Sequence, residues 1–210
     1  MESLCRFENF EAVEKLIASG RGGILHTGHL GNWEVAGTSI APLRSKLAGI
    51  ARHIKNPLID RWLLETRQMR GNKVIYHHDP FFSAARHIKH GGFVGILMDQ
   101  NLHQGGVFVP FFGRPAATTT LTALLAVKLG CPVIGFNIWR EGPQIVGRFE
   151  EPLYARRNSD PEQETLRMTA ELTGILEKWI RQRPDNWLWG HNRWKRVPGA
   201  EDKRVEAIAA

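Results

Sequence analysis

Cysteine is scarce in this chain, and long apolar runs are missing. The 210 residues include two cysteines, Cys5 and Cys131, which lie far apart and share no metal-ligand spacing. Their scarcity argues against a disulfide scaffold or a cysteine metal site and favours a reducing compartment. No stretch approaches the ~20 apolar residues of a membrane-spanning helix. No charged-then-apolar leader opens the chain, so a signal peptide is not expected.

Several functional motifs are also missing. There is no internal repeat and no Gly-x-Ser-x-Gly elbow, so a covalent serine intermediate is not expected. The basic residues are scattered rather than interleaved with aromatic ones, and no nucleic-acid-binding motif is present, which disfavours a nucleic-acid partner. Positive charge is plentiful, with a formal net charge of +7 at pH 7. Such a charge indicates an anionic partner, for example a phosphate-bearing lipid, a membrane surface or an acidic carrier protein.

The alternation of helical and strand-like segments predicts a single α/β domain. We expect a central, mostly parallel sheet flanked by helices. The predicted strands lie near 22–25, 47–51, 74–76, 93–98, 133–139 and 144–149, and the predicted helices near 10–20, 32–42, 57–70, 82–89, 118–128 and 161–181. Residues 101–117 are expected to form a loop.

The stretch HTGHLGNWEV at residues 26–35 is too rich in polar side chains for a simple corner. If a strand ends near Thr27 and a helix begins near Asn32, His29 lies at the carboxyl end of a strand, where open α/β sheets bind ligands. Gly31 permits the chain to fold back, so that Glu34 is expected to reach the imidazole. A histidine oriented by a carboxylate is a general base, and without a protein nucleophile the attacking group is a substrate hydroxyl or water. The alternative is a structural histidine beside a helix-capping glutamate.

Metal binding is a further alternative for the histidines. His26 and His29 form an H-x2-H pair, and residues 77–79 (His-His-Asp) form a second cluster. Metal ligands on a helix are usually four residues apart, however, and no third ligand has convincing spacing. We therefore predict no metal site.

Four blocks together resemble one enzyme family. The box from His29 to Glu34 resembles the H-G-N-W-E box of the bacterial lipid A biosynthesis acyltransferases (the late, or lauroyl/myristoyl, acyltransferases), a version of the H-x4-D/E motif of glycerolipid acyltransferases. The other blocks are 56–71, which contains Arg67, then 99–113 (Asp-Gln, followed by GVFVPFFG), and 187–195 (WLWGHNRWK). They occur in the family's order over residues from about 8 to 196.

The resemblance implies an O-acyltransferase with a glycerolipid-acyltransferase-like fold. Its domain would occupy residues 1–196, followed by a charged, flexible tail at 197–210. In this reading His29, oriented by Glu34, deprotonates a hydroxyl of an anionic glycolipid, most plausibly a lipid A precursor. The hydroxyl attacks an acyl carrier protein or coenzyme A thioester, without a cofactor. Backbone amides near Asn32 are expected to stabilise the oxyanion. The family's N-terminal membrane anchor is absent, so we expect peripheral binding at the cytoplasmic face of a bacterial inner membrane.

Further residues are predicted to bind substrate. In the helix at 57–70, the buried face is expected to consist of Leu58, Ile59, Trp62, Leu63 and Thr66. Arg67 and Arg70 flank that face, where a guanidinium grips a phosphate with two hydrogen bonds. Arg52, Asn32, Asp99 and Gln100 are also assigned to substrate binding, with Asp99 beside His29 but not acting as the base. The apolar run Val107–Phe112 is expected to form core, acyl groove or membrane contact.

Two other readings stay open at this point. The acceptor is also compatible with a phosphatidylinositol mannoside, a lysophospholipid or an ornithine-type lipid, because the motifs are shared. A protein of another class, a non-catalytic module that binds anionic lipid or nucleic acid, would explain the positive charge without catalysis.

Overall fold

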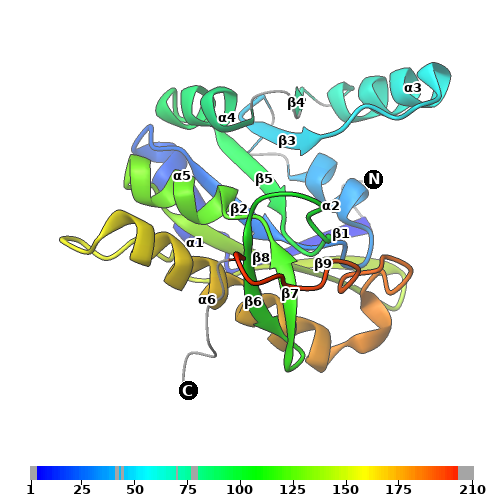
Figure 1. Ribbon diagram of the computed structural model, residues 1–210. Coiled ribbons are helices and arrows are strands. Elements are labelled where there is room, and N and C mark those ends of the chain that lie inside the picture. Colours follow the sequence, from blue (N-terminus) through cyan, green and yellow to red (C-terminus); the bar gives the residue numbers. More distant parts are fainter. Residues whose placement is uncertain (1–3, 41–42, 44, 70, 77–79, 203–210) are drawn as a thin grey trace.

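The computed structural model describes residues 4–40, 43, 45–69, 71–76 and 80–202. It shows one α/β domain built on a seven-stranded sheet of order β1-β9-β8-β2-β5-β3-β4, as predicted (Figure 1). The strands are β1 (Cys5–Glu8), β2 (Gly23–Thr27), β3 (Leu47–Ala51), β4 (Lys73–Tyr76), β5 (Phe93–Leu97), β8 (Val133–Glu141) and β9 (Gln144–Phe149). Among these pairs only β8 and β9 run antiparallel.

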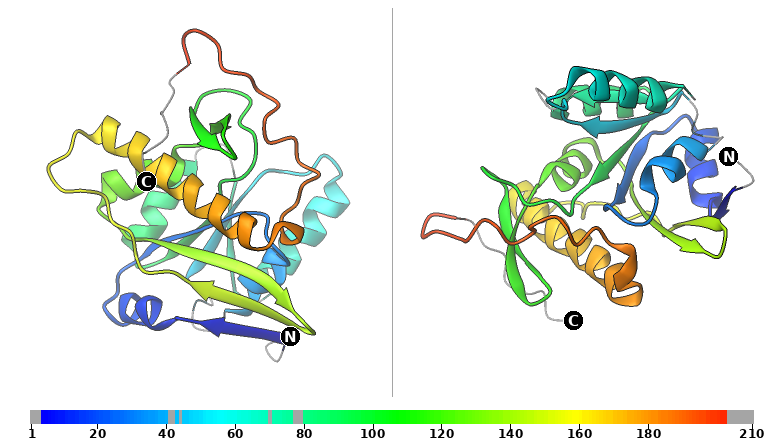
Figure 2. Two further views of the ribbon diagram at one scale, coloured as in Figure 1. Left: turned by 90° about the horizontal axis from the view of Figure 1, so that it is seen from below. Right: turned by 90° about the vertical axis from the view of Figure 1, so that its right-hand side faces the viewer.

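Helices cover the sheet on both sides, and a small hairpin lies beside it (Figures 1 and 2). The described helices are α1 (Glu11–Ala18), α2 (Trp33–Ser39), α3 (Pro57–Gln68), α4 (Pro80–Lys89), α5 (Leu121–Leu129), α6 (Pro161–Gln182) and the 3-10 turn η3 (Pro184–Asn186). The hairpin consists of β6 (Val107–Phe111) and β7 (Arg114–Thr118). Residue 70 and residues 77–79 lie outside the described residues, so the predictions for Arg70 and for the His-His-Asp cluster cannot be placed.

Side chains alternate between the two faces of the sheet along the central strands, and this divides the core into two parts. Ile24 of β2 and Val94 of β5 belong to one apolar cluster with α4, α5 and part of α6. Leu25 of β2 and Phe93 of β5 belong to the cluster that contains α1 and α2. Every residue of β2 is buried, as expected for a central parallel strand covered on both faces.

Local capping chemistry sets several helix starts where the sequence indicates them. The Asn32 side chain accepts a hydrogen bond from the Val35 amide at 3.1 Å, and Asn56 accepts one from the Leu58 amide at 3.0 Å. Asp160 caps α6 through the Gln163 amide at 2.9 Å. These oxygens satisfy amide groups that the first helical turn leaves without a partner.

The predicted buried face of α3 is wrong. Leu58 is 78% exposed, Trp62 is 61% exposed, and α3 has no buried residue. In Figures 1 and 2 the helix projects along one edge of the molecule instead of packing flat on the sheet. The residues of α3 that line a cavity are Asp60, Leu63, Leu64 and Arg67. The apolar pattern of α3 therefore reflects two apolar faces, of which only one turns toward the protein.

The loop predicted at 101–117 is also wrong in part, because it contains the β6–β7 hairpin. Phe112 and Gly113 connect the strands, and both have positive φ, at 52° and 71°. Two such residues form the primed type of turn that suits the twist of a hairpin. Four of the six residues in the run Val107–Phe112 are buried in the protein, and none lines the cavity. Most of the run is therefore core, and it does not border this cavity.

Candidate active site

His29 lies just beyond the end of β2, and its partner is Asp99, which follows β5. The two strands are parallel neighbours, so their carboxyl ends bring the two residues together. Asp99 Oδ1 accepts a hydrogen bond from His29 Nδ1 at 2.8 Å, and Asp99 Oδ2 accepts one from the His29 backbone amide at 2.8 Å. Asp99 thus fixes both the backbone and the ring of His29.

A third donor completes the environment of Asp99. The indole Nε1 of Trp187 donates to Asp99 Oδ2 at 2.8 Å, and Asp99 is only 3% exposed. Burial by itself raises the pKa of Asp99. The hydrogen bonds and charge of His29, together with the Trp187 hydrogen bond, outweigh burial and hold the pKa below its ordinary value. An ionised carboxylate only accepts hydrogen bonds, so His29 carries its proton on Nδ1 and leaves Nε2 free to act as a base.

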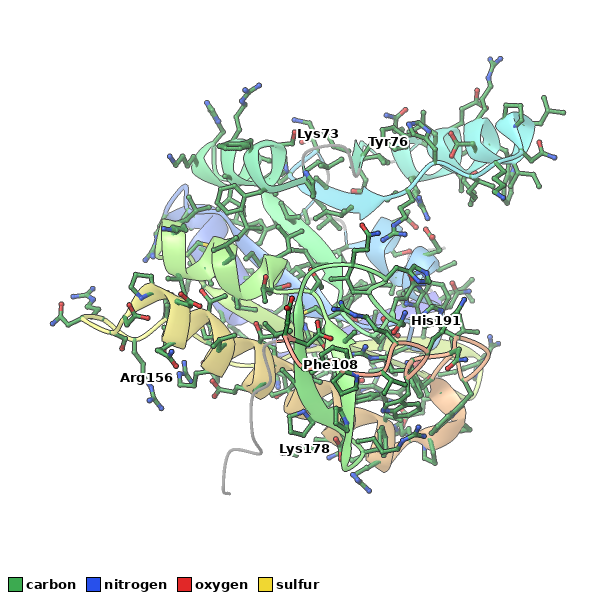
Figure 3. The ribbon with its side chains drawn as sticks, viewed as in Figure 1. Lys73, Tyr76, Phe108, Arg156, Lys178 and His191 are labelled. Atoms are coloured by element: carbon green, nitrogen blue, oxygen red, sulfur yellow. The ribbon has the colours of Figure 1, made fainter. Side chains whose placement is uncertain are left out.

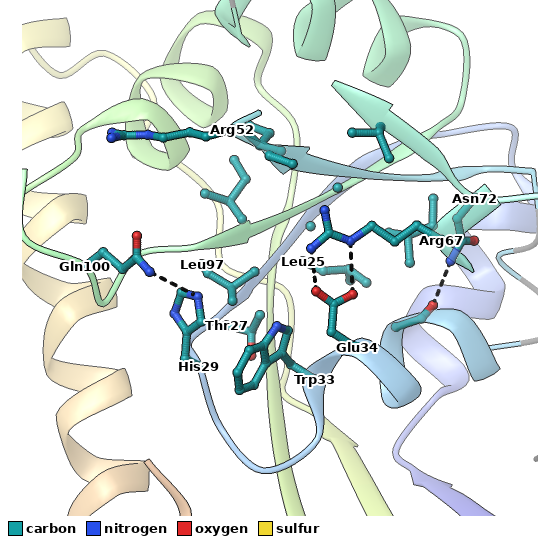
Figure 4. Close-up of a pocket in the computed structure, with 18 of the residues that line it drawn as sticks. Leu25, Thr27, His29, Trp33, Glu34, Arg52, Arg67, Asn72, Leu97 and Gln100 are labelled. Atoms are coloured by element: carbon teal, nitrogen blue, oxygen red, sulfur yellow. Dashed lines mark hydrogen bonds and ion pairs between the residues drawn. The ribbon is translucent and has the colours of Figure 1, made fainter. Parts of the chain in front are cut away.

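Glu34 has a different partner. Both of its carboxylate oxygens accept hydrogen bonds from Arg67 of α3, from Nε at 3.1 Å and from Nη2 at 2.5 Å (Figure 4). The hydrogen bond from Arg67 to Glu34 raises the pKa of Arg67, against the effect of burial. The ion pair joins α2 to α3 across the cavity and gives its wall a fixed guanidinium.

The predicted contact between Glu34 and His29 is therefore wrong. The Nδ1 atom of His29 bonds Asp99. Its Nε2 atom lies 3.3 Å from the amide Nε2 of Gln100, and Glu34 is bound to Arg67 (Figure 4). Spacing along the chain favoured Glu34, but the α2 turn directs its carboxylate toward α3, whereas sheet pairing brings Asp99 to the imidazole. The placement of Asp99 beside His29 is as expected. The catalytic roles remain predictions.

Two glycines in the H-T-G-H-L-G stretch permit this geometry. A Cβ on Gly28 would lie 2.8 Å from Leu176 Cδ1 and 3.2 Å from Asp99 Cγ, so a larger residue would push Asp99 away. Gly31 has φ of +49°, and a Cβ there would lie 2.9 Å from Asn186 Oδ1. Glycine is the residue that tolerates both the positive φ and the close approach.

Residues 187–193 hold the loops that carry His29 and Asp99 in place through hydrogen bonds. Besides the Trp187 contact, the Leu188 amide donates to the His29 carbonyl at 3.1 Å, and the Asn101 amide donates to His191 Nε2 at 2.8 Å. The buried Arg193 guanidinium donates to the carbonyls of Ala117 at 2.6 Å and of Gln100 at 3.4 Å. Burial lowers the pKa of Arg193 to about 10, and the charge of Asp99 opposes this shift.

Sequence analysis missed these supporting roles of Trp187, His191 and Arg193. Their block, residues 187–195, was named only for the family resemblance, without a role for these three side chains. The sequence did contain a signal, an arginine and a histidine among aromatic residues. An arginine or a histidine requires polar partners when it is buried. The identity of those partners depends on contacts across about 90 residues of chain, and spacing does not reveal such contacts.

A cavity of about 490 Å³ opens beside His29. It lies on the α2 and α3 side of the sheet and is bordered by His29, Trp33, the Glu34–Arg67 pair and Gln100 (Figure 4). Its volume is within the range of small-molecule pockets, about 300–1,000 Å³. Arg52, just after β3, also lines the cavity, as expected for a substrate-binding residue. Asn32 caps α2 and is not among the lining residues, so its predicted contact with substrate has no support.

Comparison with known proteins places this geometry in a family. The sequence profile described as bacterial lipid A biosynthesis acyltransferase matches residues 1–196. The chain belongs to this family. Similarity to individual members is low. A stretch of 152 residues is 30% identical to the lipid A biosynthesis lauroyltransferase of Escherichia coli, covering 71% of this chain and 49% of that protein.

Two further relatives, one of them with another named acceptor, are similar as well. The phosphatidylinositol mannoside acyltransferase of Mycobacterium tuberculosis is 25% identical over 134 residues, covering 62% of this chain and 42% of that protein. The lipid A biosynthesis palmitoleoyltransferase of Escherichia coli is 25% identical over 197 residues, covering 92% of this chain and 62% of that protein. This family member spans roughly half the length of the relatives it matches.

The described residues of this family member contain neither a membrane-spanning helix nor a metal-ligand cluster. No described helix is both long enough and apolar enough to cross a bilayer. Within the same residues, no group of three or more histidine, cysteine or acidic side chains is arranged to hold a metal ion. His26, the first histidine of the predicted H-x2-H pair, is fully buried in β2, and its Nε2 bonds the Leu172 carbonyl of α6 at 2.9 Å. It points to the opposite side of the sheet from the cavity.

Proposed function

We propose that this chain transfers a fatty acyl group from a thioester to a hydroxyl of a glycolipid. The observation that carries the proposal is the His29–Asp99 pair, whose free imidazole nitrogen borders a cavity lined largely by apolar residues. Membership of the lipid A acyltransferase family supports acyl transfer as the reaction class. The pairing replaces Glu34 by Asp99 as the carboxylate that orients the base.

The chemistry follows from the tautomer that Asp99 imposes. Nε2 of His29 takes the proton of the acceptor hydroxyl as its oxygen attacks the thioester carbonyl carbon. The tetrahedral intermediate collapses, the carbon–sulfur bond breaks, and the imidazolium returns the proton to the leaving thiolate. The products are an ester and a free thiol. Asp99 stabilises the imidazolium between these steps, as the aspartate of a catalytic triad does.

Donors around the reacting edge assist the transfer. The Gln100 amide lies 3.3 Å from His29 Nε2, where the acceptor hydroxyl must sit, so substrate would displace this contact. The Arg67 guanidinium, fixed by Glu34, and Arg52 provide positive charge in the cavity wall for a phosphate or for the developing oxyanion. The predicted backbone amides near Asn32 remain a further proposal for the oxyanion. The reaction requires no cofactor.

For the substrates, we propose an acyl carrier protein or coenzyme A thioester as donor and a lipid A precursor as acceptor. The relatives named as lipid A lauroyl- and palmitoleoyltransferases support this acceptor. Relatives named as phosphatidylinositol mannoside acyltransferases make that glycolipid the second candidate. A lysophospholipid or an ornithine-type lipid is compatible with the same chemistry. The formal charge of +7 suits every one of these anionic partners.

A membrane surface is the proposed site of action, at the cytoplasmic face of a bacterial inner membrane. The outward face of α3 exposes Leu58, Trp62 and, just past its end, Met69. The neighbouring helix α4 exposes Phe82, together with Arg86 and Lys89, and has no acidic residue. Both helices lie along the same edge of the molecule (Figures 1 and 3). Exposed apolar side chains combined with cations are typical of proteins that bind anionic bilayers from the side.

The test is a reaction with acyl coenzyme A and several acceptor glycolipids, analysed by mass spectrometry. We expect an acylated glycolipid, and a rate reduced by about 100-fold or more in His29→Ala, the scale for loss of a general base. His90→Ala is the matched control, because His90 is exposed and does not line the cavity. Acyl transfer to water alone would make the protein a thioesterase. An unchanged rate in His29→Ala would refute His29 as the base. Glycolipid binding that survives in His29→Ala, with no acyl transfer by the native protein, would favour the non-catalytic binding module.

A further inference from the structure

The floor of the cavity is a row of four residues that lie side by side across the sheet. The strand registers pair Leu25 with Gly95, Gly95 with Gly49, and Gly49 with Val74, and all four line the cavity. The row therefore runs from β2 through β5 and β3 to β4. Its two middle positions carry no side chain.

Space is open above both glycines. Among the described residues, a Cβ on Gly49 would meet no atom within 4 Å, and one on Gly95 would meet only the Ala48 carbonyl and Leu47 Cδ1, each at 3.9 Å. On the opposite wall, Gly37 of α2 also lines the cavity and also has nothing within 4 Å of its Cβ position. Three glycines on two walls thus face the same empty volume.

Neither conformation nor crowding requires glycine at these positions. Gly37, Gly49 and Gly95 are not among the residues with positive φ, and no neighbour in the described part of the chain would clash with a methyl group. Glycine inside a strand or helix destabilises it by roughly 0.5–1 kcal/mol relative to alanine. Protein interiors are normally close-packed, so a bulky side chain from the sheet is expected under a covering helix. The missing side chains keep open a space that packing would otherwise fill.

The four-residue row differs in polarity from the reacting edge. The row is apolar, and beside it Ile40 and Leu47 are buried in the core. Lys73, at the start of β4, and the Glu34–Arg67 pair are charged lining residues outside this row. The polar side chains His29, Arg52 and Gln100 come after the strand ends, at the reacting edge. At the start of β4, the Asn72 amide donates to the Gly37 carbonyl at 3.1 Å, so its polar group is satisfied within the protein. This difference fits an amphiphile with its reacting head at His29 and an unbranched hydrocarbon tail over the glycines.

We propose that Gly49 and Gly95, opposite Gly37, form the channel for the acyl chain and set the longest chain that the enzyme accepts. The proposal rests on the function proposed above and adds the residues that select the acyl group. A side chain at either strand position projects into the channel and shortens it. Each methylene that no longer fits loses roughly fourfold in affinity, from the usual value of a buried methylene.

The experiment measures chain-length preference in Gly49→Val and Gly95→Val. Saturated acyl coenzyme A donors of increasing length are compared by kcat/KM, and free saturated fatty acids are compared by displacement of a fluorescent fatty acid. We expect both profiles to shift toward shorter chains, with the long-to-short ratio falling by about tenfold or more for a loss of two methylenes. We expect thermal stability to be equal or higher, because valine favours strands.

Gly174→Val is the matched control. Gly174 lies on α6, is exposed, has no atom within 4 Å of its Cβ position and does not line the cavity. It should leave both profiles unchanged. Unchanged profiles in both folded strand variants, with His29→Ala still inactive, would overturn the channel and leave the proposed function standing. A different result would overturn the function and support the channel. In that case the native protein forms no ester from any donor, but fatty-acid binding depends on chain length and shifts in the variants.

Discussion

Replacing Asp99 by asparagine tests the central pairing of the site with almost no change in shape. Asp99 Oδ2 accepts two hydrogen bonds from fixed donors, the His29 amide and the Trp187 indole, and Oδ1 accepts one from His29 Nδ1. In the variant, one oxygen becomes an NH2 group. Turning that group toward the two fixed donors would leave buried N–H groups unsatisfied, at roughly 1–3 kcal/mol each. The asparagine oxygen therefore stays with the two donors, and its NH2 group faces His29.

That orientation reverses the tautomer of His29. Nδ1 must then accept a hydrogen bond, so the ring proton moves to Nε2, which can no longer take a proton from the acceptor hydroxyl. A wrong tautomer enforced in this way costs roughly 10⁴ in kcat in serine proteases. We expect a loss of the same order here, with a smaller change in KM, because Asp99 is buried and does not line the cavity.

The assay follows thiol release from acyl coenzyme A in the presence of the acceptor, with a thermal melt to confirm folding. Glu34→Gln is the comparison variant, since it weakens the bond to Arg67 but leaves the bonds of His29 intact. We expect it to lose much less activity than Asp99→Asn. Activity of Asp99→Asn within about tenfold of the native enzyme, or a greater loss in Glu34→Gln, would refute the reasoning and return the orienting role to Glu34.

Two further predictions concern acid stability and membrane binding. Burial lowers the pKa of His26 from 6.5 to about 4. Between these pH values the folded state binds fewer protons than the unfolded state. The free energy of unfolding therefore has its full value above pH 6.5 and falls by roughly 3 kcal/mol as the pH drops toward 4. The lowered pKa of Asp99 acts in the same direction at still lower pH. Urea melts at several pH values should show this loss, and His26→Gln should remove the His26 part of it; a flat profile in the native protein would contradict the cause. Trp62→Glu changes the exposed face of α3 and should reduce sedimentation with vesicles that contain anionic phospholipid by about tenfold. Turnover of a soluble donor should stay unchanged. Equal sedimentation of the native protein and the variant would exclude this face as the membrane-binding surface.

Most of the fold could be predicted from local patterns. The predicted strand 47–51 matches β3, and Asn32 and Asn56 cap the helices that they were predicted to begin. These features are local, because a cap depends on its own turn and a buried strand on its own run of apolar residues. The β6–β7 hairpin was missed because Phe112 is an unusual residue for a turn with positive φ. Strand β1 was missed because four residues of mixed polarity give no periodic signal.

Sequence reasoning anticipated that several of these residues lie close together, but not how they pair. His29, Asp99 and Gln100 meet at one edge of the sheet, which follows from the rule that parallel strands present their carboxyl ends together. Arg67, on α3, lines the cavity beside them. The choice of Asp99 instead of Glu34 as the partner of His29 depends on strand order, because β2 and β5 are neighbours. No spacing within a single segment contains that information.

By itself, the sequence determined the class of fold, the family and the residue types needed for acyl transfer, because these depend on short motifs and local periodicity. The tertiary structure decided which carboxylate pairs with His29, which face of α3 turns inward, and that three glycines line the cavity beside His29. Those outcomes depend on contacts between segments as many as about 90 residues apart. Such contacts form only when the sheet is assembled, since pairing and packing, rather than spacing along the chain, fix which side chains meet.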